Sequence, residues 1–225
     1  MTSFHDRRTF IAALPSLAGL ATLGAGSTLA IAASAAGEPA ARRNSEWDLS
    51  FLDTLHGRHK QVFSLGSLKG HTPLHVVTNY LDAHLEVFRL RYPDVNTVVG
   101  INGGAFPINA NDALWVKYEL GRRWEIKDPA TDEWARRNVF LDPMPAPPGK
   151  VVGVRALMAR GTIFWQCNNS LTGVVAMLVR DLGRPAEEIR DELLAGLNPG
   201  VHLVPAHTMA LGLCQERGCS YEQIG

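Results

Sequence analysis

Cys167 is the residue whose type and position point most directly to chemistry in this chain of 225 residues. It follows the short apolar run 162–166 (TIFWQ) and precedes the polar run Asn168-Asn169-Ser170, which is typical of a helix start. Backbone N–H groups at a helix start favour a negatively charged neighbour, and the thiolate is the nucleophilic form of cysteine. The position therefore predicts a reactive thiol. The alternative is a small core cysteine that fills the strand.

His207 is the second candidate. It follows the apolar run 201–204 (VHLV) at the start of a predicted helix. Beside Cys167, its imidazole would act as a base or would stabilise the thiolate as an imidazolium. The alternative is a histidine at a helix start that faces water.

Asn102, Gly103 and Gly104 form a third candidate segment, directly after the β-branched run 95–101 (VNTVVGI). Glycine has no side chain, so this loop either approaches a ligand closely or makes a tight turn. We predict that it binds the ligand together with the amides of Asn168 and Asn169. The chain has no G-x-G-x-x-G pattern, so we expect no dinucleotide and assign no cofactor.

His71 and His75 are four residues apart at a predicted helix start, a spacing that places two metal ligands on one face. A metal site needs further ligands, which Cys167 or His207 would have to supply. The sequence has no known coordination signature, so we assign no metal and keep His71 as a ligand-binding candidate.

The chain has three cysteines. Cys214 and Cys219 are five positions apart across Gly218, and in an oxidising compartment they could form a disulfide. Cys167 would then be the odd, free cysteine. A pair between Cys167 and Cys214 remains an alternative, because sequence does not establish disulfide geometry.

The elements that would position these residues alternate between strands and helices. This order predicts a single three-layer α/β domain with a mostly parallel sheet of about five strands. Ligands bind beyond the carboxyl ends of such strands, where His71, Asn102, Cys167 and His207 would meet. The predicted strands are 60–68, 95–101, 162–166, 201–204 and 219–224, and the predicted helices are 74–92, 109–120, 151–160, 171–181, 187–197 and 208–217.

The charge distribution divides the chain. Basic and acidic residues number 22 each, and this neutrality disfavours a nucleic-acid partner. Residues 9–37 carry no charge, follow Arg7-Arg8 and end in small residues, which resembles a twin-arginine (Tat) signal. We therefore expect export, with membrane contact only through this signal.

We predict three parts of the chain: a signal at 1–36, a polar linker at 37–58 with a short helix near 47–55, and an α/β domain at 59–225. Within that domain, the proline-rich residues 122–148 form an irregular surface excursion.

Three segments of the C-terminal half resemble the DsrE/DsrF-like family. They are ALMARGTIFWQCNNSL around Cys167, LNPGVHLVP over 197–205 and QERGCSY over 215–221. The resemblance covers about 150–224 well and 60–121 less closely. It implies a flavodoxin-like fold, assembly into homo-oligomers and, as in some members, relay of sulfur as a persulfide on the residue that matches Cys167. The signal and the excursion at 122–148 depart from the cytoplasmic members.

These observations combine into one leading hypothesis and two alternatives. The leading hypothesis is an exported sulfur carrier or sulfurtransferase-like protein, with a small sulfur compound or a sulfur donor or acceptor protein as its partner. In one alternative, the chain is a non-catalytic module that binds a small ligand or metal, with Cys167 structural. In the other, it is a subunit of a larger assembly.

Overall fold

Five parallel strands form one sheet in the order β4-β3-β2-β1-β5. The computed structural model describes residues 47–68, 73–142 and 152–225. All seven residues of β2 are buried, as expected for an apolar, β-branched strand covered on both faces. The strands are β1 (His59–Leu65), β2 (Val95–Ile101), β3 (Ile163–Cys167), β4 (Val201–Val204) and β5 (Ser220–Gln223).

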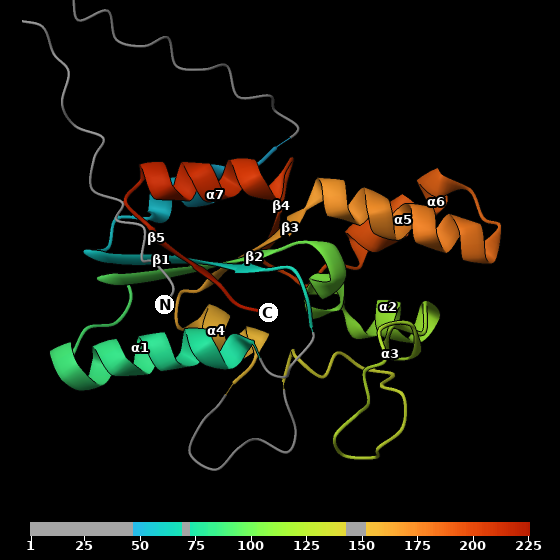
Figure 1. Ribbon diagram of the computed structural model, residues 1–225, viewed down its shortest axis with the longest axis horizontal. Helices are drawn as coiled ribbons and strands as arrows, with labels where there is room; N and C mark the ends of the chain where they lie inside the picture. The colour runs from blue at the N-terminus through green and yellow to red at the C-terminus, as the bar shows by residue number, and fades with distance from the viewer. Residues whose placement is uncertain (1–46, 69–72, 143–151) are drawn as a thin grey trace, which may run out of the picture. The chain divides into compact units, whose positions relative to one another are not determined.

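Helices cover both faces of this sheet (Figure 1). One face packs against α7 (His207–Glu216) and the short 3₁₀ helix η1 (Ser50–Thr54), and the other packs against α1 (Leu74–Phe88) and α4 (Val154–Ala159). Neighbouring strand residues face opposite layers: Val62 belongs to the core beneath α7, and Phe63 belongs to the core above α1. The expected three-layer, flavodoxin-like α/β fold is confirmed.

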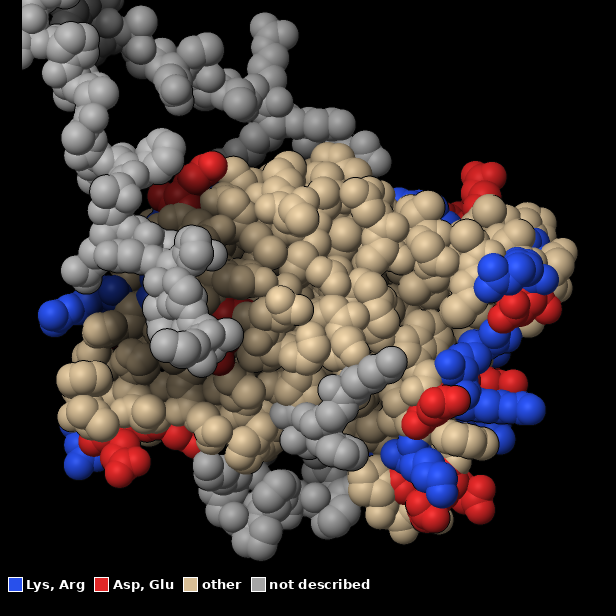
Figure 2. All heavy atoms as spheres, in the orientation of Figure 1, with Lys and Arg blue, Asp and Glu red and all other residues tan. Residues whose placement is uncertain are grey.

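A third core lies among helices beside the sheet, at the right of Figure 1. It is formed by α2 (Asp112–Lys117), α3 (Leu120–Arg123), α5 (Asn168–Leu182), α6 (Ala186–Ala195) and the 3₁₀ helix η2 (Gly103–Asn109). Figure 2 shows charges of both signs intermixed over this end, and the middle of the face in view is largely uncharged. Some of these neighbouring positive and negative side chains form ion pairs, such as Arg123–Asp181 and Arg184–Glu192.

Most predicted elements appear at the expected places. The strands at 95–101 and 201–204 are confirmed to the residue, and α5 begins three residues earlier than expected because Cys167 itself precedes its first turn. The helix expected at 109–120 is divided into α2 and α3, since Glu119 adopts a left-handed conformation with φ of 48°. Among the described residues, no helix is long and apolar enough to span a bilayer.

Two predicted boundaries look different in the structure. Part of the expected linker packs onto the domain, because η1 buries Phe51 and Leu52 beneath α7. In the expected surface excursion, residues 124–142 have no helix or strand, yet Asn138 is buried and donates to the carbonyls of Ile108 and Ala110. The signal at 1–36, His71 and residues 143–148 of the excursion lie outside the described residues.

Candidate functional site

The strand register brings the candidate residues to one edge of the sheet. Gln166 on β3 pairs with Ile101 on β2, and Cys167 pairs with Val204 on β4. The next residue after Ile101 is Asn102, so the loop after β2 begins beside Cys167. His207 follows β4 by three positions and begins α7. The predicted meeting of these residues at the carboxyl ends of the strands therefore agrees with the register.

Cys167 lies where two helices begin. It is the residue that precedes α5, and its Sγ accepts a hydrogen bond of 3.3 Å from the backbone N–H of His207, the first residue of α7. The first N–H groups of a helix have no partner within the helix and carry a partial positive charge. The start of α7 therefore places a positive partial charge against the sulfur, whereas the Cys167 side chain makes no capping hydrogen bond to α5. The side chain is enclosed, since only 4% of the residue is exposed.

The imidazole of His207 is engaged elsewhere. The indole Nε1–H of Trp165 donates to its Nδ1 over 3.2 Å, and its Nε2 lies 2.8 Å from the hydroxyl of Ser64. Because an indole only donates, Nδ1 carries no proton, and the proton of the neutral ring lies on Nε2 and is donated to Ser64. Burial lowers the pKa of His207 to about 4, so the ring is neutral at pH 7. In this arrangement the main chain of His207, not its imidazole, contacts the thiol.

Gly100 explains how this ring pair fits beneath α7. A Cβ at Gly100 would lie 2.4 Å from Cζ2 of Trp165 and 2.8 Å from Cε1 of His207. Both distances are shorter than any normal contact between carbon atoms, so only glycine leaves room for the two rings. The glycine on β2 thus fixes the place of His207 and, through it, the start of α7.

The segment Asn102-Gly103-Gly104 lies against the end of β1, and its two glycines are the first residues of η2. Gly103 has a φ of 48°, in the left-handed region that favours glycine, and the N–H of Gly104 donates to the carbonyl of Gly66 over 2.8 Å. A Cβ on Gly66 would come within 2.6 Å of the Asn102 side-chain oxygen. The glycines therefore allow the loops after β1 and β2 to approach each other. Gly103 and Gly104 remain exposed at this edge.

Asn168 and Asn169 occupy the first turn of α5. Asn169 is exposed, whereas the Asn168 side-chain oxygen accepts a 2.7 Å hydrogen bond from Nη2 of Arg190 on α6. This guanidinium brings a positive charge to the helix start that already favours an anion. Sequence reasoning missed both Arg190 and Ser64, because each meets its partner across a long separation in the chain and no local pattern marks it.

Among the described residues, no set of metal ligands gathers at this edge. His75 lies on α1, on the face of the sheet opposite to α7 and His207 (Figure 1). Within residues 47–68, 73–142 and 152–225, no three His, Cys, Asp or Glu side chains gather closely enough to hold a metal ion.

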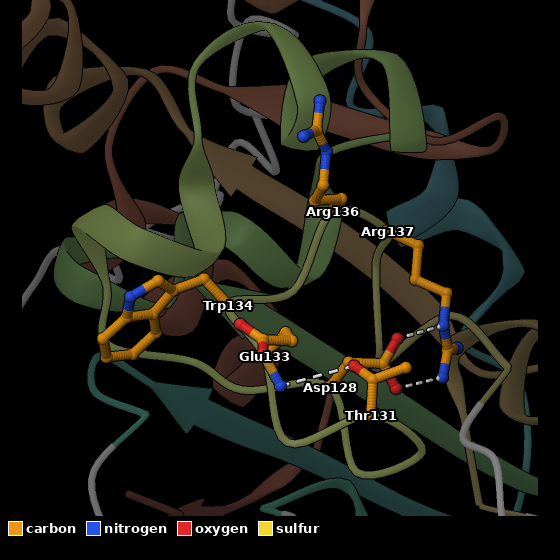
Figure 3. Close-up of a pocket in the computed structure, with 6 residues that line it drawn as sticks. All are labelled: Asp128, Thr131, Glu133, Trp134, Arg136 and Arg137. Atoms are coloured by element: carbon orange, nitrogen blue, oxygen red, sulfur yellow. Dashed lines mark hydrogen bonds and ion pairs between the residues drawn. The ribbon is translucent and has the colours of Figure 1, made fainter.

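A hollow of about 360 Å³ lies elsewhere, on the irregular segment that follows α3. Figure 3 shows the Asp128 carboxylate facing Arg137, with Trp134 and Arg136 pointing away from this pair. The Arg137 guanidinium lowers the pKa of Asp128, and the two charges compensate each other. The lining holds neither a thiol nor an imidazole, and its Asp128 carboxylate is paired with Arg137, so Cys167 remains the stronger candidate for chemistry.

Comparisons with known proteins add little. No protein-family model matches the chain, and no curated protein matches it. Among solved structures, the chain is similar to a protein of unknown function, MTH1491 from Methanobacterium thermoautotrophicum. The two are 13% identical with a TM-score of 0.37, over 73% of this chain and 98% of that protein. This likeness carries no functional information for the chain.

Proposed function

We propose that the protein carries sulfur as a persulfide on Cys167, in a sulfurtransferase-like relay. The observation that supports this most is the hydrogen bond from the His207 backbone N–H to Sγ of Cys167, at a point where α5 and α7 both begin. An N–H group fixed in this way stabilises the Cys167 thiolate before it attacks the donor and again when it leaves on discharge. The resemblance of the segment around Cys167 to the DsrE/DsrF-like family supports the same chemistry.

The transfer needs no cofactor. The Cys167 thiolate attacks the outer sulfur of a persulfide donor, R–S–SH; the S–S bond of the donor breaks, and RS⁻ leaves with the bonding electron pair. Cys167 then holds the sulfur as S–SH. An acceptor thiolate attacks that outer sulfur in turn, and the Cys167 thiolate leaves and is regenerated.

Burial restricts the donor. With 4% of Cys167 exposed, a bulky electrophile cannot reach the sulfur without movement of the surrounding loops. A small inorganic polysulfide fits this constraint better, and a donor or acceptor protein would have to open the edge near Gly103 and Gly104. The exposed glycines and Asn169 are the residues that such a partner would meet first.

The same proposal includes export and assembly. The arginines at positions 7 and 8 and the charge-free residues after them would direct the folded protein through the Tat pathway to the periplasm or beyond. The mature chain would then work as a homo-oligomer. Replacement of both arginines by lysine should retain the protein in the cytoplasm, and light scattering of the mature chain should give a multiple of the protomer mass.

A loading and discharge experiment tests the carrier function. The purified protein is incubated with inorganic polysulfide, separated from it and weighed by mass spectrometry. The mass should rise by about 32 Da, one sulfur atom, and should return to its starting value when cyanide removes the sulfur as thiocyanate. The Cys167→Ala variant should show neither change. A full gain of sulfur by that variant would refute the proposal.

One observation favours a second candidate, a binding module in which Cys167 is structural. The thiol is enclosed and already has a backbone partner, as an inert core cysteine would. In that case native Cys167 should resist both iodoacetamide and polysulfide, although it reacts after denaturation. Reaction with polysulfide in the native state separates the two candidates.

A further inference from the structure

Cys214 and Cys219 occupy two linked positions at the end of α7. The N–H of Cys219 donates to the Cys214 carbonyl over 3.1 Å, and the N–H of Gly218 donates to the Gln215 carbonyl over 2.9 Å. Gly218 has a φ of 81°, in the left-handed region. These features define a Schellman motif, in which the sixth residue bonds back to the first and the fifth bonds back to the second.

This motif normally brings the side chains of its first and sixth residues into contact, where they form a small apolar pair. Here both of those residues are cysteine. Both belong to the core beneath α7, with Cys214 fully buried and 6% of Cys219 exposed. In this structure both are free thiols. The backbone hydrogen bonds that end α7 thus also hold the two cysteine side chains next to each other.

The two thiols are electrostatically unequal. The neighbouring Cys219 and burial raise the pKa of Cys214. The Cys214 thiol lowers the pKa of Cys219, and the positive charges of Lys60 and Arg217 act in the same direction. Cys219 is therefore the cysteine that more readily becomes a thiolate, and Cys214 keeps its proton. This division suits an attacking thiol and a resolving thiol.

We propose that Cys214 and Cys219 form a reversible redox pair, which closes to a disulfide by exchange with an external disulfide. With only 6% of Cys219 exposed, the exposed edge strand β5 that follows it must first move aside. The Cys219 thiolate then attacks one sulfur of the oxidant R–S–S–R and releases RS⁻. Cys214 then loses its proton to solvent and attacks the Cys219 sulfur, and the second RS⁻ leaves. Two protein thiols are oxidised, and one external disulfide is reduced to two thiols.

The geometry also assigns the pairing. The Sγ of Cys167 contacts the first residue of α7, and Cys214 lies seven residues further along that helix. At a rise of about 1.5 Å per residue this separation is about 10 Å, beyond the reach of a disulfide. The redox pair and the proposed sulfur-carrying cysteine are therefore separate sites at opposite ends of one helix.

Peptide mapping tests the proposal, because trypsin cleaves after Arg217, between the two cysteines. The native full-length protein is incubated with glutathione disulfide, quenched in acid, alkylated with iodoacetamide and digested. A disulfide should join the peptides 191–217 and 218–225, and the intact mass, measured before alkylation, should fall by about 2 Da. Dithiothreitol should release them.

Variants keep the result unambiguous. Cys167→Ala should form the linked peptides as the parent protein does, whatever the outcome of the sulfur-carrier experiment. Cys214→Ala should stop at a glutathione adduct on Cys219, and Cys219→Ala should leave Cys214 reduced. Separate alkylation of both cysteines after exposure to excess oxidant, or a link that includes the Cys167 peptide 161–180, would overturn the proposal.

Discussion

The backbone N–H of His207 donates a hydrogen bond to Sγ of Cys167, and the imidazole of the same residue points to Trp165 and Ser64 instead. One residue thus has two functions. Its ring fixes the start of α7 against the sheet edge, and its main chain contacts the sulfur. The chemical environment of Cys167 is therefore set by a helix start rather than by a general base.

Substitution of His207 by proline or alanine separates these functions. Both variants lose the ring, but only proline also lacks the N–H, and proline is tolerated as the first residue of a helix. A hydrogen bond to a charged group contributes about 1.5–3 kcal/mol, so loading of Cys167 by polysulfide should be at least about tenfold slower in His207→Pro than in His207→Ala. Equal loading rates, measured by mass spectrometry on the folded variants, would contradict a role for the N–H.

Stability should decrease as pH falls from 7 to 5. Burial lowers the pKa of His207 from 6.5 to about 4, so the unfolded chain binds a proton in this range and the folded chain does not. Stability is therefore complete above the unfolded pKa and is lost as pH falls towards 4, by about 2 kcal/mol at pH 5. Urea unfolding across this range measures the loss.

The His207→Gln variant is the control for this pH dependence. Burial also lowers the pKa of His202, which contributes to the same slope. The neutral amide of glutamine does not titrate, so the variant should keep the contribution of His202 alone. An unchanged slope in His207→Gln would assign the effect to other groups.

Gly100→Ala should destabilise the domain. The added Cβ would overlap Trp165 and His207, and overpacking of this kind costs about 1–3 kcal/mol. Gly173, exposed on α5, is the matched control, since a Cβ there meets nothing within 4 Å. Gly173→Ala should stabilise the helix by about 0.5–1 kcal/mol. Denaturant midpoints that shift in the same direction for both variants would disprove the packing argument at Gly100.

Oxidation of Cys214 and Cys219 should raise the melting temperature. A disulfide that closes a loop of this length stabilises the fold by about 2 kcal/mol if it forms without strain. For a domain of this size that corresponds to about 4–8 °C. Calorimetry of the oxidised and reduced protein measures the difference, and Cys214→Ala should show none. A lower melting temperature after oxidation would mean that the disulfide strains the end of α7.

Local patterns in the sequence were enough to predict the architecture and the sheet edge at which the candidate residues meet. The run 95–101 is β-branched and bounded by turns, so it could be recognised as a buried strand without knowledge of its neighbours. The rule that ligands bind beyond the carboxyl ends of parallel strands then placed Asn102, Cys167 and His207 together. Each of these inferences uses residues that are close in sequence.

Contacts across long separations could not be predicted in this way. Ser64 meets His207 across 143 positions, and Arg190 meets Asn168 across 22, and neither pair leaves a periodic signal. The sulfur of Cys167 is contacted by the backbone N–H of His207 and not by its imidazole, because the indole of Trp165 already holds the imidazole. The burial of Asn138 also depends on a contact between distant parts of the chain. Its side-chain amide donates to the backbone carbonyls of Ile108 and Ala110, and buried carbonyls require such a donor.

The most direct test of the sulfur-carrier proposal is to locate the sulfur on a peptide. Native protein is treated with polysulfide, its thiols and persulfides are blocked by alkylation, and the tryptic peptides are identified. The account predicts that a mass about 32 Da above that of the alkylated thiol appears on peptide 161–180, which contains Cys167 as its sole cysteine. Sulfur confined to Cys219 on peptide 218–225, with Cys167 unmodified, would contradict the account.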